Sequence, residues 1–384
     1  MGDLIQLDAG KLVDGKWKVE KKLGEGAFGA VYKCSDSSGK LFALKVEGKD
    51  EKIQLLKMEV IVLGELAAQN SNRHFCKIES KGQVENFNYV VMTFVGKSLQ
   101  DLRLAGPKRY FSMGTALSIG IQCLEALEDL HSIGYLHRDV KPGNYTVGRA
   151  EIGEIRKVYL LDFGMCRKFV HEDGTIRKPR NVAGFRGTVK YAAISCHAGR
   201  ELCRSDDLES WLYQQAELTR GVLPWRNLKD YDEIGQMKMK SRSDLGTKQL
   251  FGNCPRQYIE IMRIIDGTKF FNPPDYKRIY ELLRQAIKST DSKEFPYDFE
   301  IVETKQPEKK PQEAPKPQEA AKPQEAAKPQ EAPKPQGAQK PQEPVKPQEP
   351  AKPQEPAKPQ EEKPVVTPAA NAAEPKSDKE EDKK

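Results

Sequence analysis

One stretch of eight residues combines side chains that could carry out phosphoryl transfer. It runs from His137 to Asn144 and places a carboxylate, Asp139, and an ammonium, Lys141, close to the Asn144 carboxamide. In such a loop Asp139 could act as the base for a hydroxyl substrate, Asn144 could bind a metal ion, and Lys141 could stabilise the transferring charge. A second carboxylate, Asp162, begins an Asp-Phe-Gly sequence and would bind Mg²⁺ that bridges the nucleotide phosphates.

Taken singly, these residues have simpler explanations. Asp139 could close a turn, and Asp-Phe-Gly at Asp162 is itself an ordinary turn signal. Their order in the chain, together with the upstream features described next, makes coincidence a poor explanation.

The segment from Trp17 to Glu47 alternates apolar and polar residues across two turn signals, which predicts three consecutive antiparallel strands. The first turn contains Gly24, Gly26 and Gly29. Glycines at this spacing are typical of a plain hairpin, and a dinucleotide-binding loop would need a helix after the last glycine. A strand pattern follows instead. We therefore expect a flap whose backbone N–H groups can approach phosphates closely, because no Cβ atoms intervene.

A lysine and a glutamate occupy unusual places in the next two elements. Lys45 lies inside an apolar strand, where it could be an edge residue that extends to water. Residues 50–68 have helical periodicity that puts Glu59 on the apolar stripe, a costly position for an unpaired carboxylate. We predict that Lys45 and Glu59 pair with each other.

The chain then changes from strands to helices. Residues 87–95 form a further β pattern, Gly96 marks a hinge, and residues 112–133 form a long amphipathic helix that ends before the proposed catalytic loop. A short β pattern at residues 158–161 leads into Asp162. This order predicts an α+β fold with a small antiparallel β-rich lobe containing one helix and a larger helical lobe.

The C-terminal part has a different composition. From Lys305 it lacks aromatic residues and repeats Lys-Pro-Gln-Glu with a period of six, so it cannot bury enough apolar surface to fold. We expect a disordered, polyproline-like spacer, with recognition by SH3 domains as the alternative because Pro341-Gln342-Glu343-Pro344 has the Pro-x-x-Pro form. Residues 305–366 contain no Ser, Thr or Tyr, which excludes regulation by phosphorylation there.

The composition limits the class of protein. The net charge is +7 with both signs interspersed, so nucleic-acid binding is not indicated. The seven cysteines lack paired metal-ligand spacing, which favours reduced thiols. The chain shows no leader pattern and no long apolar stretch. We expect a cytoplasmic protein, with the nucleus as a second location, that acts as a monomer without membrane partners.

Several dispersed motifs resemble the casein kinase 1 superfamily of protein kinases and, within it, the tau-tubulin kinase-like branch. The matching stretches are Leu56-Lys57-Met58-Glu59-Val60, Phe87-Asn88-Tyr89-Val90-Val91-Met92, Val182-Ala183-Gly184-Phe185-Arg186-Gly187-Thr188-Val189-Lys190-Tyr191, Asp206-Asp207-Leu208-Glu209-Ser210, Leu223-Pro224-Trp225-Arg226 and Pro274-Asp275-Tyr276. The resemblance implies a two-lobed protein kinase fold at residues 15–302, with lobes at 15–95 and 96–302, an extension at 1–14 and a tail at 303–384.

The resemblance also implies site residues, with ATP and Mg²⁺ as cofactors. Catalysis would involve Asp139 as base, Lys141, Lys45 on the phosphates and Glu59 to orient Lys45, and the metal ligands would be Asn144 and Asp162. Met92 would be the gatekeeper, and Asp207 would brace the catalytic loop. The expected nucleotide-binding residues are Leu23, Gly24, Gly26, Gly29, Val31, Ala43, Lys45, Met92 and Val95.

Departures from the family pattern concern the activation segment. The usual Ala-Pro-Glu is absent, and Ala192-Ala193-Ile194-Ser195 stands near its place.

Arg186, Lys190 and Lys229 could form a pocket for acidic or phosphorylated substrates, although exposed cations commonly belong to a solvated surface. A further hypothesis is that phosphorylation at Thr175 or Thr188 switches the activation segment, with Arg138 binding the phosphate. The alternative for Thr188 is a structural role beside the catalytic loop. We assign no partner to Arg138.

Together these features predict a serine/threonine protein kinase that acts on protein substrates. Lys141 in the catalytic loop is similar to the serine/threonine-specific form of the family. The alternative is a catalytically weak, kinase-like scaffold that acts through its proline-rich tail.

Overall fold

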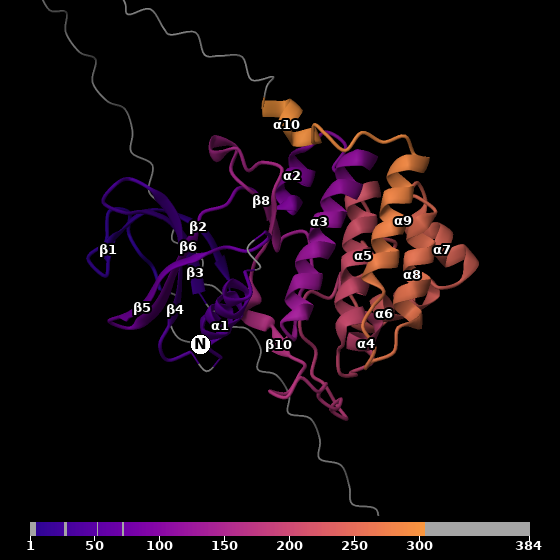
Figure 1. The fold of residues 1–384 in the computed structure, drawn as a ribbon, viewed down its shortest axis with the longest axis horizontal. Coiled ribbons are helices and arrows are strands. Elements are labelled where there is room, and N and C mark those ends of the chain that lie inside the picture. Colours follow the sequence, from indigo (N-terminus) through magenta and orange to yellow (C-terminus); the bar gives the residue numbers. More distant parts are fainter. Residues whose placement is uncertain (1–4, 27–28, 52, 71–72, 304–384) are drawn as a thin grey trace, which may run out of the picture. The chain divides into compact units, whose positions relative to one another are not determined.

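The N-terminal lobe is built on one antiparallel sheet. The computed structural model describes residues 5–26, 29–51, 53–70 and 73–303, and Figure 1 shows the sheet on one side of a group of helices. The strand order is β1-β2-β3-β4-β6-β5. The strands are β1 (Leu12–Val13), β2 (Trp17–Gly26), β3 (Gly29–Ser35), β4 (Leu41–Gly48), β5 (Ile78–Val84) and β6 (Phe87–Thr93).

The three predicted strands between Trp17 and Glu47 are confirmed as β2, β3 and β4, and each neighbouring pair is antiparallel. β4 lies between β3 and β6, so Lys45 is on a central strand and is not an edge residue. The helix found among the described residues of the lobe, α1 (Leu55–Ala68), buries Glu59 together with Leu56, Val62, Leu63 and Leu66. The alternation along the strands and the helical period of α1 therefore gave the correct elements, because each element buries one face.

The C-terminal lobe is mainly helical. Its centre is formed by α3 (Met113–Ser132) and α5 (Arg204–Arg220), two helices that pack against each other. The Trp211 indole N–H of α5 donates to the Gly120 carbonyl of α3 at 3.1 Å. The other helices are α2 (Leu99–Ala105), α4 (Ile194–His197), α6 (Tyr231–Lys240), α7 (Asp244–Phe251), α8 (Gln257–Gly267), α9 (Tyr276–Ser289) and α10 (Asp298–Glu303).

Short strands and turns of this lobe carry the residues of the proposed catalytic loop. β7 (Tyr135–Leu136) pairs with β10 (Arg167–Lys168), and β8 (Tyr145–Val147) pairs with β9 (Val158–Leu160). The 3-10 turns are η1 (Ala150–Ile152) and η2 (Phe163–Met165). The catalytic loop lies between β7 and β8, and Asp162 follows β9. The two-lobed α+β fold expected from the sequence is confirmed for the described residues.

Gly96 lies where the chain passes from β6 to α2. Its N–H donates to the Val147 carbonyl oxygen at 2.8 Å. A Cβ atom at this position would lie 2.9 Å from that same oxygen and 3.0 Å from the Gly148 oxygen. The segment that connects the two lobes therefore lies so close to β8 that any residue other than glycine at position 96 would push the two backbones apart.

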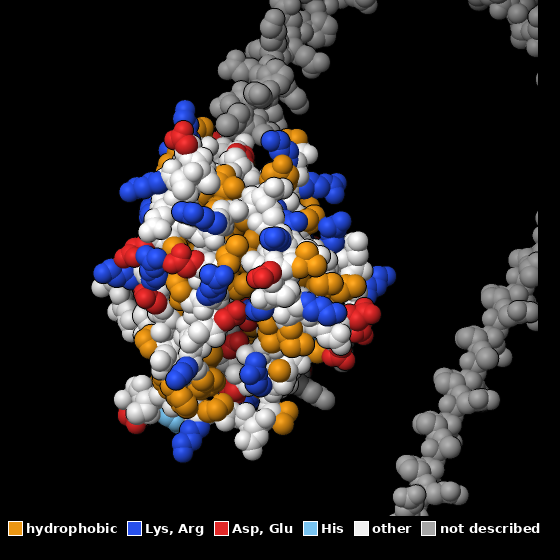
Figure 2. Space-filling view, turned by 90° about the vertical axis from the view of Figure 1, so that its right-hand side faces the viewer, with side chains coloured by type: hydrophobic (Ala, Val, Ile, Leu, Met, Phe, Trp, Pro, Cys, Tyr) orange, Lys and Arg blue, Asp and Glu red, His pale blue; other side chains and the backbone are white. Residues whose placement is uncertain are grey.

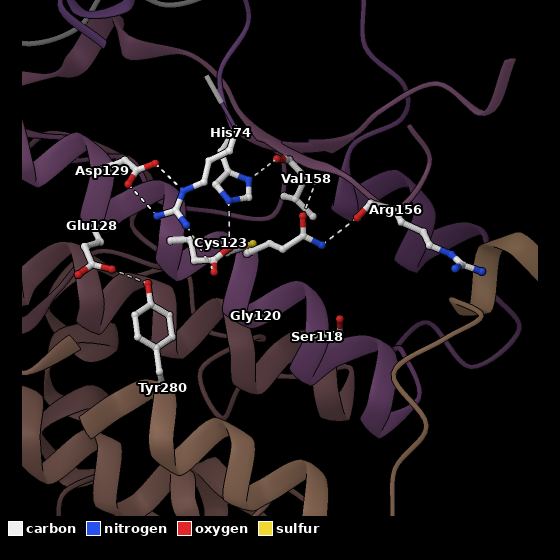
Figure 3. A network of polar contacts seen from close by, with 12 residues as sticks. His74, Ser118, Gly120, Cys123, Glu128, Asp129, Arg156, Val158 and Tyr280 are labelled. Carbon is white, nitrogen blue, oxygen red and sulfur yellow. Dashed lines mark hydrogen bonds and ion pairs between the residues drawn. The ribbon is translucent and has the colours of Figure 1, made fainter. Parts of the chain in front are cut away.

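A polar network fixes the segment that precedes β5 to the C-terminal lobe (Figure 3). The His74 ring lies 2.8 Å from the Val158 carbonyl oxygen through Nδ1 and 3.1 Å from Glu125 through Nε2. The neighbouring Arg73 guanidinium donates two hydrogen bonds of 2.8 Å to Asp129 of α3. This bidentate contact and the buried His74 ring hold the segment before β5 against α3 and β9.

No helix among the described residues is long and apolar enough to cross a membrane. On the face shown in Figure 2, Lys and Arg side chains are scattered, with Asp and Glu side chains among them. The predicted spacer after residue 303 lies outside the described residues, so its disorder stays a prediction.

Candidate active site

A cleft of about 1470 Å³ contains all of the predicted catalytic, nucleotide-binding and metal-binding residues in its lining. The glycine hairpin and β4 contribute from the N-terminal lobe, and the catalytic loop and Asp162 contribute from the C-terminal lobe. Arg186, Lys190 and Lys229 do not line this cleft. The residues from the N-terminal lobe are Leu23, Gly24, Gly26, Gly29, Val31, Ala43, Lys45, Glu59, Met92 and Val95, and those from the C-terminal lobe are Asp139, Lys141, Asn144 and Asp162.

The glycines of the hairpin differ in how much space surrounds them. A Cβ atom on Gly24 would meet nothing within 4 Å, so this position is open on the cleft side. A Cβ atom on Gly29 would lie 2.1 Å from the Val46 carbonyl oxygen of β4. Gly29 is therefore required for the packing of β3 on β4, a reason that the spacing in the sequence did not indicate.

The predicted pair of Lys45 and Glu59 is present and includes a third member. Lys45 Nζ lies 2.6 Å from Glu59 Oε2 and 3.2 Å from Asp162 Oδ1. Glu59 is only 3% exposed. Burial lowers the pKa of Lys45, but the charges of Glu59 and Asp162 outweigh this effect and hold the pKa above its usual value.

Lys45 also stabilises the charged form of Asp162. Burial would raise the pKa of the Asp162 carboxyl, but the Lys45 ammonium overcomes this effect and lowers it. Asp162 adopts a left-handed backbone conformation with φ of 66°. Gly164, two residues after Asp162, lies so close to α1 that a Cβ atom would be 2.8 Å from Leu55 Cβ. Thus the Asp-Phe-Gly segment is packed directly against the helix that carries Glu59.

The Asp139 carboxylate is oriented by neighbours on both sides. Its Oδ2 accepts a hydrogen bond from Lys141 Nζ at 2.6 Å, and its Oδ1 accepts one from the Thr188 hydroxyl at 2.7 Å. Lys141 Nζ also donates to Thr188 Oγ1 at 3.0 Å. A carboxylate that is 6% exposed and fixed in this way can accept a proton from a hydroxyl brought to the cleft.

The loop that carries Asp139 is anchored by Asp207 at the start of α5. Asp207 Oδ2 accepts the His137 N–H at 2.7 Å, and Oδ1 accepts the Arg138 N–H at 2.8 Å. His131 Nε2 lies 2.9 Å from Oδ2. Burial acts to raise the pKa of Asp207, but the hydrogen bonds and the nearby histidines outweigh it and lower the pKa. This is the bracing position that the resemblance implied for Asp207.

Arg138, for which the sequence gave no partner, contacts the backbone after Asp-Phe-Gly. Its Nε donates to the Met165 carbonyl oxygen at 2.7 Å, and its φ is 67°. Burial and the nearby Arg167 charge lower the pKa of Arg138. The neighbouring Arg167 and Arg180 both form ion pairs with Glu201, whereas Arg138 contacts a backbone carbonyl group. Arg138 therefore joins the catalytic loop to the start of the activation segment.

Asn144 and Asp162 fit the requirements of a divalent metal ion. Asn144 Nδ2 donates to the Asp139 carbonyl oxygen at 2.8 Å, which leaves Oδ1 available to a cation. The lowered pKa of Asp162 supplies an anionic oxygen. Carboxylate and carboxamide oxygens are the ligands that hard divalent ions prefer. A metal ion held by these residues would neutralise the charge of nucleotide phosphates.

The three cations of the expected anion pocket have different surroundings. Lys190 Nζ lies 2.6 Å from Glu217 Oε1, a carboxylate of α5 that is 2% exposed and also contacts the Tyr191 hydroxyl. Arg186 is exposed and donates to the Phe185 carbonyl oxygen. Lys229 is exposed at the surface before α6. Lys190 is therefore already paired within the protein.

The sequence interpretation missed residues at the base of the cleft. Cys76, Thr146 and Leu161 line it, and Cys76 packs in one buried cluster with Met92. No local pattern singles these residues out, because they come from separate loops and strands that only the fold brings together.

The catalytic part of the chain matches known proteins. Residues 17–275 match the family model described as protein kinase domain. The chain is 38% identical over 299 residues to a candidate serine/threonine-protein kinase of Dictyostelium discoideum, covering 77% of this chain and 59% of that protein. It is 40% identical over 279 residues to the Caenorhabditis elegans serine/threonine-protein kinase spe-6, covering 71% of this chain and 72% of the relative.

A further relative bears on the casein kinase resemblance. The chain is 30% identical over 298 residues to a C. elegans candidate casein kinase I, covering 77% of this chain and 86% of that protein. This supports a casein kinase-like member of the family without separating its branches. Protein kinase domains use ATP and a divalent metal ion, and the residues of the cleft are of the types that bind them.

The contacts of Thr188 lead to a first prediction. Replacing Thr188 by Val removes the hydroxyl that lies between Asp139 and Lys141. We expect kcat for a peptide substrate to fall about 10- to 100-fold, the usual effect of one lost hydrogen bond to a charged group, with the KM for ATP unchanged. Thr188→Ser keeps the hydroxyl and should stay close to the parent in steady-state kinetics. A Thr188→Val variant as active as the parent would contradict the role of this hydroxyl.

Proposed function

The chain belongs to the protein kinase family and carries a serine/threonine kinase domain, and from this we propose that it is catalytically active. It transfers the γ-phosphoryl group of ATP, bound with Mg²⁺, to Ser and Thr hydroxyls of protein substrates. The oxygen ligands of Asn144 and Asp162 suit a hard divalent ion, and Mg²⁺ is the ion that we propose. Because the chain spans 59% of its relative from D. discoideum, the activity of the whole protein is part of the proposal.

The observation that carries the proposal is the arrangement of charges across the cleft. Asp139 is held between Lys141 and Thr188 on one wall, and Lys45 is held between Glu59 and Asp162 on the other. One wall is suited to a substrate hydroxyl and the other to nucleotide phosphates. A scaffold without turnover would not need both sets of charges in place.

The substrate class is the finer part of the proposal. We infer that substrates are acidic or already phosphorylated proteins and that the chain belongs to the tau-tubulin kinase-like branch. Arg186 and Lys229 are exposed cations near the activation segment and α6, and they are free to contact an anionic substrate group more readily than Lys190. Because exposed ion pairs are weak, the preference should be moderate.

The C-terminal repeats are proposed to act as a spacer that separates the kinase domain from whatever follows or binds it. The Pro-x-x-Pro copies after Pro341 offer a second role as ligands of SH3 domains. A cytoplasmic location, with the nucleus as a second possibility, and a monomeric state stay proposals from the sequence.

The activity is tested by replacing two carboxylates of the C-terminal lobe, Asp139 beside Lys141 and Asp162 beside Lys45. We expect the parent to transfer phosphate from Mg-ATP to casein or tubulin, and we expect Asp139→Asn and Asp162→Asn to lose about 100-fold or more of this activity. The measurement is incorporation of labelled phosphate into Ser and Thr. If the parent transfers no more phosphate than the two variants, the chain is a scaffold.

The substrate preference is tested with paired peptides that differ only in a phosphoserine next to the acceptor serine. The parent should have a higher kcat/KM for the phosphorylated peptide, and the Arg186→Ala/Lys229→Ala double variant should lose up to about tenfold of this preference. The matched control is Lys277→Ala/Lys288→Ala, which changes the net charge equally at two exposed residues of α9. Equal preference in the parent and both double variants would remove these residues from the proposal.

The tail is tested by pulldown of SH3 domains with the full chain. Retention of any domain should disappear when Pro341, Pro344, Pro347, Pro350, Pro353 and Pro356 are replaced by Ala, because every Pro-x-x-Pro copy from Pro341 to Pro359 contains at least one of these prolines. A panel in which nothing is retained leaves only the spacer role.

A further inference from the structure

A buried lysine of α6 contacts the backbone of the activation segment. Lys238 is 0% exposed, although lysine is rarely found fully buried. Its Nζ donates to the Val189 carbonyl oxygen at 2.7 Å and to the Ala192 carbonyl oxygen at 2.6 Å. It also lies 3.1 Å from His197 Nε2. Lys238 therefore binds the backbone immediately before Lys190 and immediately after Tyr191.

The three contacts match the three protons of an ammonium group. Two carbonyl oxygens accept two protons, and the third contact requires that His197 Nε2 be an acceptor. Burial and the charge of Lys238 lower the pKa of His197 to about 4, so its ring is neutral and can accept at Nε2. The contacts thus use every donor of the charged form of Lys238.

No carboxylate forms an ion pair with Lys238 among the residues that the structure describes. Glu209 of α5 has the largest favourable charge effect on Lys238, but it is engaged by Arg242 at 3.0 Å and by the Ile194 N–H at 3.1 Å. The Tyr213 and Trp225 rings lie 5.4 Å from Lys238 Nζ and give further stabilisation. Burial lowers the pKa of Lys238 to about 7, which shows how costly the position is.

The backbone that Lys238 holds leads directly to the catalytic base. Thr188, whose hydroxyl donates to Asp139, precedes Val189, and the N–H groups of Tyr191 and Ala192 donate to the Thr188 carbonyl oxygen. This is also the part of the chain in which the usual Ala-Pro-Glu is missing. A displacement of Val189 or Ala192 would therefore move Thr188 relative to Asp139.

Lys190 and Tyr191, which lie between the two carbonyl groups, are held from a different side. Both contact Glu217 of α5. The same short segment is thus fixed by a buried cation from α6 and a buried anion from α5. A segment held in this way is suited to position a substrate and not only to fill space.

We propose that Lys238 is a positioning residue that holds the backbone from Thr188 to Ala192 in the arrangement in which a substrate hydroxyl reaches Asp139. The inference rests on the proposed kinase activity and adds a residue outside the cleft to it. The simpler alternative is that Lys238 only stabilises the packing of α6 on the C-terminal lobe.

The test compares Lys238→Met and Lys238→Arg with the matched control Lys240→Met, which replaces an exposed lysine on the same helix. We expect Lys238→Met to lower kcat/KM for a peptide substrate at least about tenfold, because the acceptor is less well positioned, while the KM for ATP stays the same. Lys238→Arg keeps the charge and should recover part of the loss. Lys240→Met should behave like the parent.

Hydrogen–deuterium exchange separates positioning from general stability. In Lys238→Met, amides of residues 188–196 should exchange faster, while those of the N-terminal lobe should not change. If Lys238→Met does not fold, Lys238→Arg and Lys238→Gln carry the test with the same two measurements. An equal fall in all kinetic parameters with exchange raised throughout the lobe would mean a purely structural role.

The outcomes also separate this inference from the proposed function. If the parent transfers phosphate and Lys238→Met keeps the peptide kcat/KM of Lys240→Met, the role of Lys238 is overturned and the kinase activity stands. If the parent is no more active than Asp139→Asn, both are overturned.

Discussion

The contact of Lys45 with both Glu59 and Asp162 is the interaction on which the rest of the site depends. It joins the central strand β4, the helix α1 and the segment after β9 in one cluster. Each of these charges would be costly alone in a half-buried cleft, and each is stabilised by the others. The cleft therefore has its catalytic shape only when the two lobes are correctly placed.

The C-terminal lobe uses the same principle on the substrate side. α5 carries buried acidic residues, and three of them hold either the catalytic loop or the residues that follow Thr188. Asp207 accepts the N–H groups of the catalytic loop, Glu209 accepts the Ile194 N–H, and Glu217 pairs with Lys190. Since α5 is packed on α3 at the centre of the lobe, these carboxylates position loop residues from a well-packed helix.

The pairing of Lys190 with Glu217 changes how the basic residues near the cleft are understood. A cation that already has a buried carboxylate partner contributes less to the binding of a phosphoryl group than an unpaired one. The moderate substrate preference proposed above follows from this pairing. It also explains why the count of basic residues in this segment is a poor measure of its affinity for anions.

The sequence by itself determined the chemistry, most elements of the N-terminal lobe, and α3 and β9 of the C-terminal lobe. The order of Lys45, Glu59, Asp139, Asn144 and Asp162 specified phosphoryl transfer, because these residue types at these spacings have few other uses together. The periods of the first strands and of α1 gave the small lobe, since alternation and helical periodicity record which face is buried. The strands β1 and β5 were not predicted, because β1 has only two residues and β5 has no buried residue that would mark one face.

Only the tertiary structure decided the partners of residues that meet across long distances in the chain. It joined Arg138 to Met165, Lys190 to Glu217 and Lys238 to Val189. Lys238 follows the buried Ile234 by four residues on α6, so the pattern that singled out Glu59 was present for it as well. Periodicity can show that such a charge is buried, but it cannot show what satisfies the charge, because the partner comes from another element whose position depends on the whole fold.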